Sequence, residues 1–191
     1  MAYDEQSQIW DEPCSARANS PMQQTVEGLK GYLRLGIEPS KLLLGLPWHE
    51  ITVRLTNTNS VINLKHWFYR YGYHYPCEKL DGDVCLLKPI PFRGCNCSDA
   101  AGREVRFGQI VQTLNRWRSE RKWDEAAESP YFSYGPVEGR MYQFRYDDPQ
   151  SLGRKYAAAR ALGLTGVGMW SAQDLDYNND TQVASMWGAL P

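Results

Sequence analysis

Residues 41–48, KLLLGLPW, and residues 165–170, TGVGMW, are the two segments that best indicate the fold class of this chain of 191 residues. Each is a short, continuous apolar run, which is typical of a strand buried on both faces, as in a parallel sheet. Apolar residues at helical spacing predict helices over Pro21 to Gly36, Pro149 to Leu162 and Thr181 to Leu190. Strands that alternate with helices indicate an α/β protein with parallel strands.

The first residues, MAYD, read as the end of a further strand. Met1 and Ala2 leave too little room before Tyr3-Asp4 for an ordinary strand of about five residues. Together with residues 41–48 and 165–170, this segment gives three parallel-type strands with helices between them.

The stretch between the second and third strands is far longer than a normal βα loop, so it must contain structure of its own. Residues 102–123, GREVRFGQIVQTLNRWRSERKW, predict a helix with apolar residues from Val105 to Trp117. Aromatic-rich runs at Tyr131–Tyr134 and Met141–Tyr146 predict a hairpin that turns between Pro136 and Gly139. We therefore expect a small α+β excursion here.

Residues 49–70, HEITVRLTNTNSVINLKHWFYR, look foreign to this pattern. They contain none of the turn signals expected of a βα loop, and without them LPW and YGY would be continuous. We interpret them as an insert, for which a retained intron is one explanation.

Composition excludes several functions. Lys+Arg is 21 and Asp+Glu is 22, so no basic face for nucleic acid is expected. No apolar run approaches the roughly 20 residues needed to span a bilayer, and the first ten residues do not resemble a signal peptide. Aromatic residues make up 13 % of the chain, with 7 Trp and 12 Tyr. Such rings in a polar chain favour an amphipathic ligand, with sugar as the leading candidate.

Four of the five cysteines lie between Cys77 and Cys97. Cys77 and Cys85 bracket a short polar loop that suits a disulfide. Buried free thiols and a zinc site with His66 and His74 are the alternatives, although the paired cysteine spacings usual for zinc are missing. Two N-x-[ST] triplets, at Asn96 and Asn179, are candidate glycosylation sites, and with the cysteines they favour an oxidising, secretory compartment.

Polar and aromatic side chains stand where the three strands finish. They are Tyr3 and Asp4, Trp48, and Trp170. A tyrosine hydroxyl and a carboxylate can hydrogen-bond the hydroxyl and amide groups of a sugar, while an indole face packs on its C–H groups. The competing interpretation makes Trp48 and Trp170 core residues that cap the sheet.

The motifs resemble those of glycoside hydrolase family 18, and within it the chitobiase branch. MAYD matches the M-x-Y-D signature of the sixth barrel strand, KLLLGLPW the seventh strand and GVGMW the eighth. Further matches are YDEQSQIW, PFRG, CSDAAGR, YDDPQS and GMWSAQDLDY. The resemblance covers nearly the whole chain except residues 49–70.

The resemblance implies an α/β fold that is a partial TIM (β/α)₈ barrel, its last three βα units, with a small α+β insertion. Residues 1–48 would hold barrel strands six and seven, 71–146 the insertion, and 147–191 a helix, strand eight and the last helix. Met1 coincides with a methionine inside the family motif, so five βα units are expected upstream. An open three-stranded remnant would expose a strand edge, so we expect this chain alone to be poorly stable.

The resemblance also implies a ligand and roles. Members hydrolyse N-acetylglucosamine β-1,4 linkages of chitooligosaccharides and N-glycan cores by a substrate-assisted, retaining route that needs no cofactor or metal, and the chitobiase branch is lysosomal. Tyr3 would contact the substrate acetamido group, Asp4 would hold that group's geometry, and Trp170 would floor the sugar subsite. Trp48, Tyr71 and Tyr73 would line the same mouth.

One departure limits this interpretation. The family's catalytic motif, D-x-x-D-x-D-x-E, supplies the glutamic acid that protonates the leaving oxygen, and it is absent from these 191 residues. Asp147-Asp148 precedes Pro149 and predicts a helix N-cap, while Asp174 and Asp176 predict a loop or a substrate rim. We therefore expect no hydrolysis by this chain alone. A catalytically dead, lectin-like module and a product without function are the alternatives.

Overall fold

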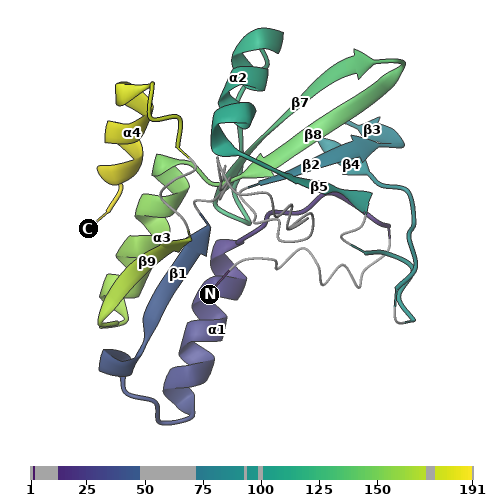
Figure 1. The fold of residues 1–191 in the computed structure, drawn as a ribbon. Coiled ribbons are helices and arrows are strands. Elements are labelled where there is room, and N and C mark those ends of the chain that lie inside the picture. The colour runs from purple at the N-terminus through teal and green to yellow at the C-terminus, as the bar shows by residue number, and fades with distance from the viewer. Residues whose placement is uncertain are drawn as a thin grey trace, which may run out of the picture.

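The computed structural model describes residues 2, 13–47, 72–92, 94–98, 101–170 and 175–190. These residues form a mixed α/β structure with one parallel two-stranded sheet, one five-stranded sheet and one small two-stranded sheet (Figure 1). The predicted insert at residues 49–70 lies outside the described residues. In the part of the chain that the structure describes, we find no helix with the length and apolarity needed to cross a membrane.

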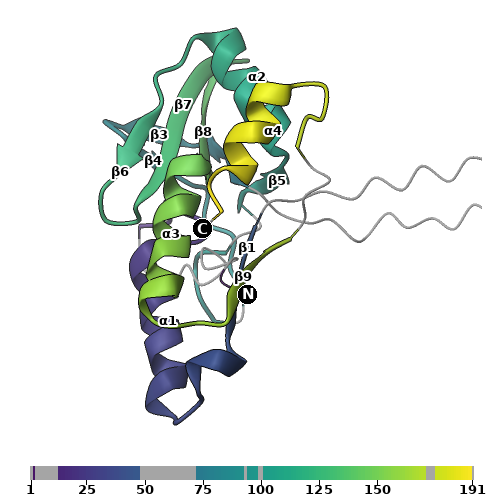
Figure 2. The same ribbon diagram turned by 90° about the vertical axis from the view of Figure 1, so that its left-hand side faces the viewer.

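The parallel pair is formed by β1 (Leu43–Pro47) and β9 (Gly166–Trp170). The three predicted helices are confirmed, and each bound lies within three residues of its predicted position: α1 (Met22–Arg34), α3 (Pro149–Ala161) and α4 (Asp180–Trp187). A 3₁₀ turn, η2 (Pro39–Lys41), leads into β1. Figure 2 shows α1 and α3 running alongside the pair.

The five-stranded sheet has the order β5-β2-β8-β7-β6, and all its pairings are antiparallel. Its members are β2 (Gly72–Cys77), β5 (Arg103–Val105), β6 (Lys122–Asp124), β7 (Ser129–Val137) and β8 (Arg140–Tyr146). The β7–β8 hairpin is confirmed, and α2 (Phe107–Trp117) packs on one face of the sheet (Figure 1). A separate small hairpin joins β3 (Lys79–Asp81) to β4 (Val84–Leu86).

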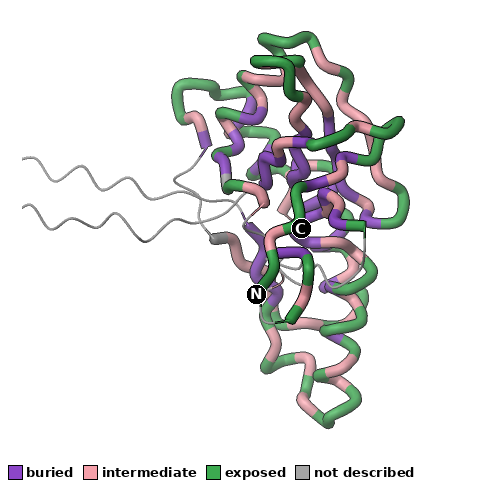
Figure 3. The backbone as a smooth tube through the Cα atoms, turned by 90° about the vertical axis from the view of Figure 1, so that its right-hand side faces the viewer, coloured by how far each residue is buried: buried purple, intermediate pink, exposed green. Residues whose placement is uncertain are grey.

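Side chains alternate along each strand, so the five-stranded sheet has two different faces. Phe132 and Phe144 point to the α2 face and share one core with Leu46 of β1. Tyr73 and Tyr75 point to the other face and pack with four cysteines in a second core. Figure 3 shows the buried segments in the middle of the molecule, with exposed turns at its ends.

Two expectations are corrected. The helix predicted over residues 102–123 is only α2, because Arg103–Val105 pairs with β2 and residues 122–124 pair with β7. Arg118 ends α2 in the left-handed conformation, with φ of 50°. The strand predicted to be buried on both faces is half-buried in β9, whereas residues 44–47 of β1 are buried. Among the described residues β9 pairs only with β1, so no second strand adds to its burial.

Candidate functional site

The carboxyl ends of β1 and β9 lie side by side. Pro47 is the register partner of Trp170, so both strands finish at the same level. On the other side of β1, the Ala2 amide donates a hydrogen bond to the Gly45 carbonyl oxygen at 2.9 Å. Three chain segments that are far apart in sequence therefore meet at one place, in the order Ala2, β1, β9.

The predicted sugar-binding side chains belong to this place or to the segments next to it. Trp170 is the last residue of β9, and its backbone position is described while its side chain is not. Tyr3, Asp4, Trp48 and Tyr71 lie outside the described residues. Tyr3 follows Ala2 directly in the sequence, and Trp48 follows Pro47.

The position of Tyr73 disagrees with its predicted role. It was predicted to line the sugar-binding mouth, but its side chain is 2 % exposed and its ring stacks on Tyr75 with 5.5 Å between centroids. The chain at Gly102 lies against both rings, because a Cβ placed there would stand 2.6 Å from Tyr75 and 3.1 Å from Tyr73. Tyr73 is therefore a packing residue of the second core.

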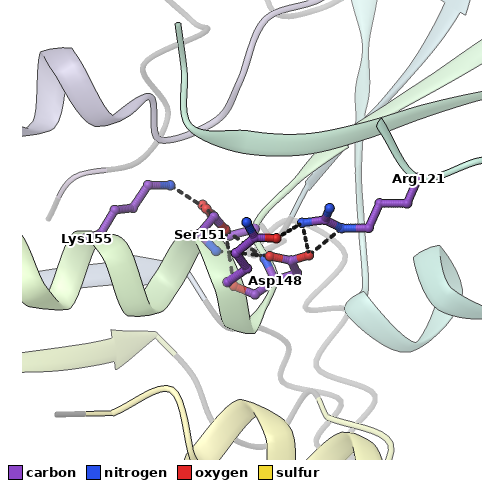
Figure 4. A network of polar contacts seen from close by, with 6 residues as sticks. Arg121, Asp148, Ser151 and Lys155 are labelled. Atoms are coloured by element: carbon purple, nitrogen blue, oxygen red, sulfur yellow. Dashed lines mark hydrogen bonds and ion pairs between the residues drawn. The ribbon is translucent and has the colours of Figure 1, made fainter. Parts of the chain in front are cut away.

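A buried polar network starts α3, at the junction between β8 and the helix (Figure 4). Asp148 is the N-cap as predicted: its carboxylate accepts from the Ser151 amide at 3.0 Å, and Ser151 Oγ accepts from the Asp148 amide at 2.9 Å. Asp147 accepts from Ser151 Oγ at 2.6 Å and from the ammonium of Lys155. The side chains of Asp147 and Lys155 are 2 % and 0 % exposed, so both charges are buried and compensate each other.

The same network ties α3 to the five-stranded sheet. Arg121, just before β6, donates to Asp148 Oδ2 from Nε at 2.8 Å and from Nη2 at 2.7 Å, and also to Gln150 at 2.9 Å. The guanidinium groups of Arg121 and Arg154 lie 5.1 and 5.0 Å from the ring of Trp123 in β6. Such cation–π contacts add to the ion pair and fix the edge strand on the helix.

Sequence reasoning found the cap but missed Lys155 and Arg121. A partial signal for Lys155 exists, because positions 151 and 155 are four residues apart and so face the same side of the helix that starts at Pro149. Arg121 offers no such signal, since its partner lies 27 positions away.

His74 of β2 is buried and both of its ring nitrogens are engaged. Arg103 Nε donates to Nδ1 at 3.0 Å, so Nε2 carries the proton and donates to Tyr134 Oη at 2.7 Å. The ring stacks on Tyr142 with centroids 4.8 Å apart. Burial and the Arg103 charge lower the pKa of His74 to about 4. The imidazole is therefore neutral near pH 7, and its ring nitrogens already serve Arg103 and Tyr134, not the zinc considered from sequence.

The cysteines form the predicted small loop and one long-range link. Cys77 is bonded to Cys85, and Cys14 is bonded to Cys97 across 83 positions. Cys95 is free and half-buried. The predicted glycosylation sites, Asn96 and Asn179, are both exposed.

Four carboxylates serve as structural partners, namely those of Asp124, Asp148, Asp83 and Glu27. Asp124 pairs with Arg145 at 2.5 Å, and Asp148 caps α3. Hydrogen bonding to Lys122 lowers the pKa of Asp83, and hydrogen bonding to Lys30 lowers the pKa of Glu27. A general acid for glycoside cleavage needs the opposite shift, a raised pKa.

Comparisons with known proteins agree with this arrangement. The model of Glycosyl hydrolases family 18 matches residues 1–176. Di-N-acetylchitobiase of Rattus norvegicus is 42 % identical over 195 residues, which cover 100 % of this chain and 47 % of that protein. Di-N-acetylchitobiase of Homo sapiens is 40 % identical and is covered to 45 %. The chain thus spans about half the length of the curated relatives it matches.

Solved structures share the fold at low sequence identity. Human YKL-39, a pseudo-chitinase with retained chitooligosaccharide binding, matches with a TM-score of 0.65 and 19 % identity over 100 % of this chain and 48 % of that one. A class V chitinase from Nicotiana tobaccum in complex with NAG4 matches with a TM-score of 0.60 and 17 % identity over 98 % of this chain and 47 % of that one. With the family model matching residues 1–176, this chain belongs to glycosyl hydrolase family 18.

Proposed function

We propose that the chain is the C-terminal sugar-binding part of a chitobiase-like glycosidase, made of the last three βα units of a (β/α)₈ barrel and its α+β insertion. Its substrate class is chitooligosaccharides and the chitobiose core of N-glycans, in the lysosome or the secreted compartment. One observation carries the proposal: Ala2, β1 and β9 lie side by side, and the family's motif residues continue from their carboxyl ends. In TIM barrels that edge carries the active site.

The proposed roles follow from position and residue type. Tyr3 and Asp4 would hydrogen-bond the acetamido group, and Trp170 would form the floor beneath the sugar ring. Trp48 and Tyr71 would complete the mouth. Packing an indole on the C–H face of a sugar removes apolar area of both partners from water, while the hydroxyl and carboxylate keep the sugar's polar groups paired.

The chemistry itself needs a residue that this chain does not contain. In the substrate-assisted route the acetamido oxygen is the nucleophile and a glutamic acid protonates the leaving oxygen. D-x-x-D-x-D-x-E is absent from the 191 residues, so the chain would bind sugar without cleaving it.

A fluorescence titration tests the proposal. We expect chitotriose to quench the tryptophan emission of the purified chain, and Trp170→Ala to abolish the saturable change. Trp117→Phe is the matched control, because Trp117 lies on α2, is 39 % exposed and belongs to a different surface. No quenching, or equal quenching in Trp170→Ala, would overturn the sugar-binding role.

The second candidate is a catalytically dead, lectin-like binding module, and the likeness in fold to YKL-39, a pseudo-chitinase with retained chitooligosaccharide binding, favours it. The transcript upstream of the Met1 codon separates the two. An open frame that runs into D-x-x-D-x-D-x-E identifies a part of a hydrolase, whereas an in-frame stop identifies a binding module. Hydrolysis of a chitobiose substrate by the chain itself, lost in Tyr3→Phe, would contradict both.

A further inference from the structure

Two N-glycosylation triplets stand in very different surroundings, at Asn96 and at Asn179. We propose that Asn179 is the glycosylated asparagine of this chain, and that the Cys14–Cys97 disulfide closes Asn96 to the same modification. The proposal is independent of the sugar-binding role, because it concerns α4 and the second core.

Asn179 has one structural role, and that role leaves its side-chain nitrogen, Nδ2, available for glycosylation. It is the N-cap of α4, and its Oδ1 accepts from the Gln182 amide at 3.1 Å. Glycosylation occurs at the other side-chain atom, Nδ2, for which no hydrogen bond to another described residue is found. The amide oxygen is retained after modification, so the glycan and the cap are compatible.

The Asn179 triplet lies on the surface of the molecule. Asn179, Asp180 and Thr181 are all exposed. The turn before them is fixed independently, since Gln182 Oε1 accepts from the Asp176 amide at 2.9 Å and the Asn179 amide donates to the Asp176 carbonyl at 2.8 Å. Figures 1 and 2 show α4 on the outside of the molecule, beside α3.

The other two residues of the Asn96 triplet, Cys97 and Ser98, are buried. Cys97 is 4 % exposed and bonded to Cys14, and the hydroxyl residue Ser98 is 5 % exposed. Ser98 Oγ is buried and has no hydrogen-bond partner among the described residues. The glycosylating transferase must contact the hydroxyl group of the triplet. In the folded chain it cannot reach Ser98 Oγ, although Asn96 itself is exposed.

Chain order strengthens the difference. Cys14 precedes Cys97 by 83 positions, so its thiol is already in the oxidising compartment when Cys97 arrives. The disulfide can then form as soon as the Asn96 triplet enters. Modification of Asn96 must compete with that step, whereas Asn179 remains accessible after folding.

The reaction is a group transfer with no redox change. The donor is a lipid-linked oligosaccharide pyrophosphate. A bond forms between Asn179 Nδ2 and the anomeric carbon, the bond from that carbon to the pyrophosphate oxygen breaks, and the lipid pyrophosphate leaves with the electron pair. The proton lost from Nδ2 goes to a base of the transferase.

The test expresses the full chain behind an added signal peptide in eukaryotic cells and measures occupancy by mass spectrometry after enzymatic glycan release. We expect at least about half of the molecules to carry a glycan at Asn179 and fewer than about one in ten at Asn96. Asn179→Asp keeps a carboxylate cap, and Thr181→Ala keeps the asparagine. Both should remove the glycan at position 179 while α4 stays folded.

The disulfide is tested separately. Cys14→Ser should raise occupancy at Asn96 at least threefold, and Asn96→Gln in that background should remove the added glycan. Cys77→Ser with Cys85→Ser removes the other disulfide of the second core and is the matched control; it should leave occupancy at Asn96 unchanged, which separates the Cys14–Cys97 bond from a general loss of folding. An unmodified Asn179, a glycan found mainly at Asn96, or no change at Asn96 in Cys14→Ser would each overturn the proposal.

Discussion

The parallel pair β1–β9 and the five-stranded sheet differ in how completely their strands are buried and paired. The five-stranded sheet is covered on both faces and ends in edge strands of only three residues, β5 and β6. Two disulfides lie beside it. The parallel pair is buried along β1 but only half-buried along β9. Short edges protect a sheet from further pairing, whereas β9 presents an unpaired edge within the described part of the chain.

We therefore expect the antiparallel region to resist local opening more strongly than the parallel pair does.

Removing the long disulfide should weaken the five-stranded region most. Cys14→Ser with Cys97→Ser releases a loop of 83 positions, for which chain entropy predicts a loss of about 4 to 5 kcal/mol. Cys77→Ser with Cys85→Ser releases a loop of 8 positions and should cost about 2 to 3 kcal/mol. Urea unfolding under non-reducing conditions measures both, and equal losses would contradict the loop-length account.

Breaking the buried ion pair between Asp147 and Lys155 should destabilise the junction between β8 and α3, where the two regions meet. Lys155→Met leaves the Asp147 carboxylate buried without a cation, which should cost about 3 to 4 kcal/mol. Adding Asp147→Asn removes that stranded charge and should recover a large part of the loss. Glu27→Gln, at an exposed pair with Lys30, is the control and should leave the free energy of unfolding nearly unchanged, because solvent screens an exposed pair.

His74 should make the antiparallel region sensitive to acid. Its pKa is about 4 in the folded chain against an ordinary value of 6.5, so the unfolded chain binds the proton first. The stability contribution is complete above pH 6.5 and is lost as the pH falls toward 4, by at most about 3 kcal/mol. His74→Gln can accept from Arg103 and donate to Tyr134, and it should flatten this part of the stability curve. Tyr134→Phe keeps the imidazole and should keep the slope.

The smallest effect should be a difference in local opening between the two sheets. We expect backbone amides of β9 to exchange with deuterium at least tenfold faster than those of β8, because fewer buried contacts oppose opening. Mass spectrometry of peptides from 140–146 and 166–170 measures this directly. Equal protection in the two strands would show that the half-buried edge carries no energetic penalty.

Most long elements could be predicted from the sequence, and the reasons are local. Continuous apolar runs gave β1 and β9, and the Asp-Asp-Pro sequence gave the start of α3. The strands β3, β5 and β6 have three residues each, too few to show any periodicity, so residues 102–123 looked like one helix. The partner of Cys14 could not be deduced either, because spacing alone does not determine disulfide connectivity.

The candidate site was only partly predictable. The order of Ala2, β1 and β9 follows from strand-like runs and parallel topology. The place of Tyr73 did not follow, since a tyrosine after a glycine looks the same whether its ring is exposed or covered by Gly102. The roles of Tyr3, Asp4, Trp48, Tyr71 and Trp170 stay predictions.

The Cys14–Cys97 link turns nearly half of the chain into a covalent ring. That ring contains α1, β1, residues 49–70 and the β3–β4 hairpin. Without the 22 residues at 49–70 it would span about 61 positions instead of 83, and closing the longer ring costs only about 0.3 kcal/mol more. A protease cut anywhere inside the ring leaves two pieces joined through sulfur, which migrate as one molecule until a reductant releases them. The ring thus lets this part of the chain gain length, or suffer a break, without losing the connection between its ends.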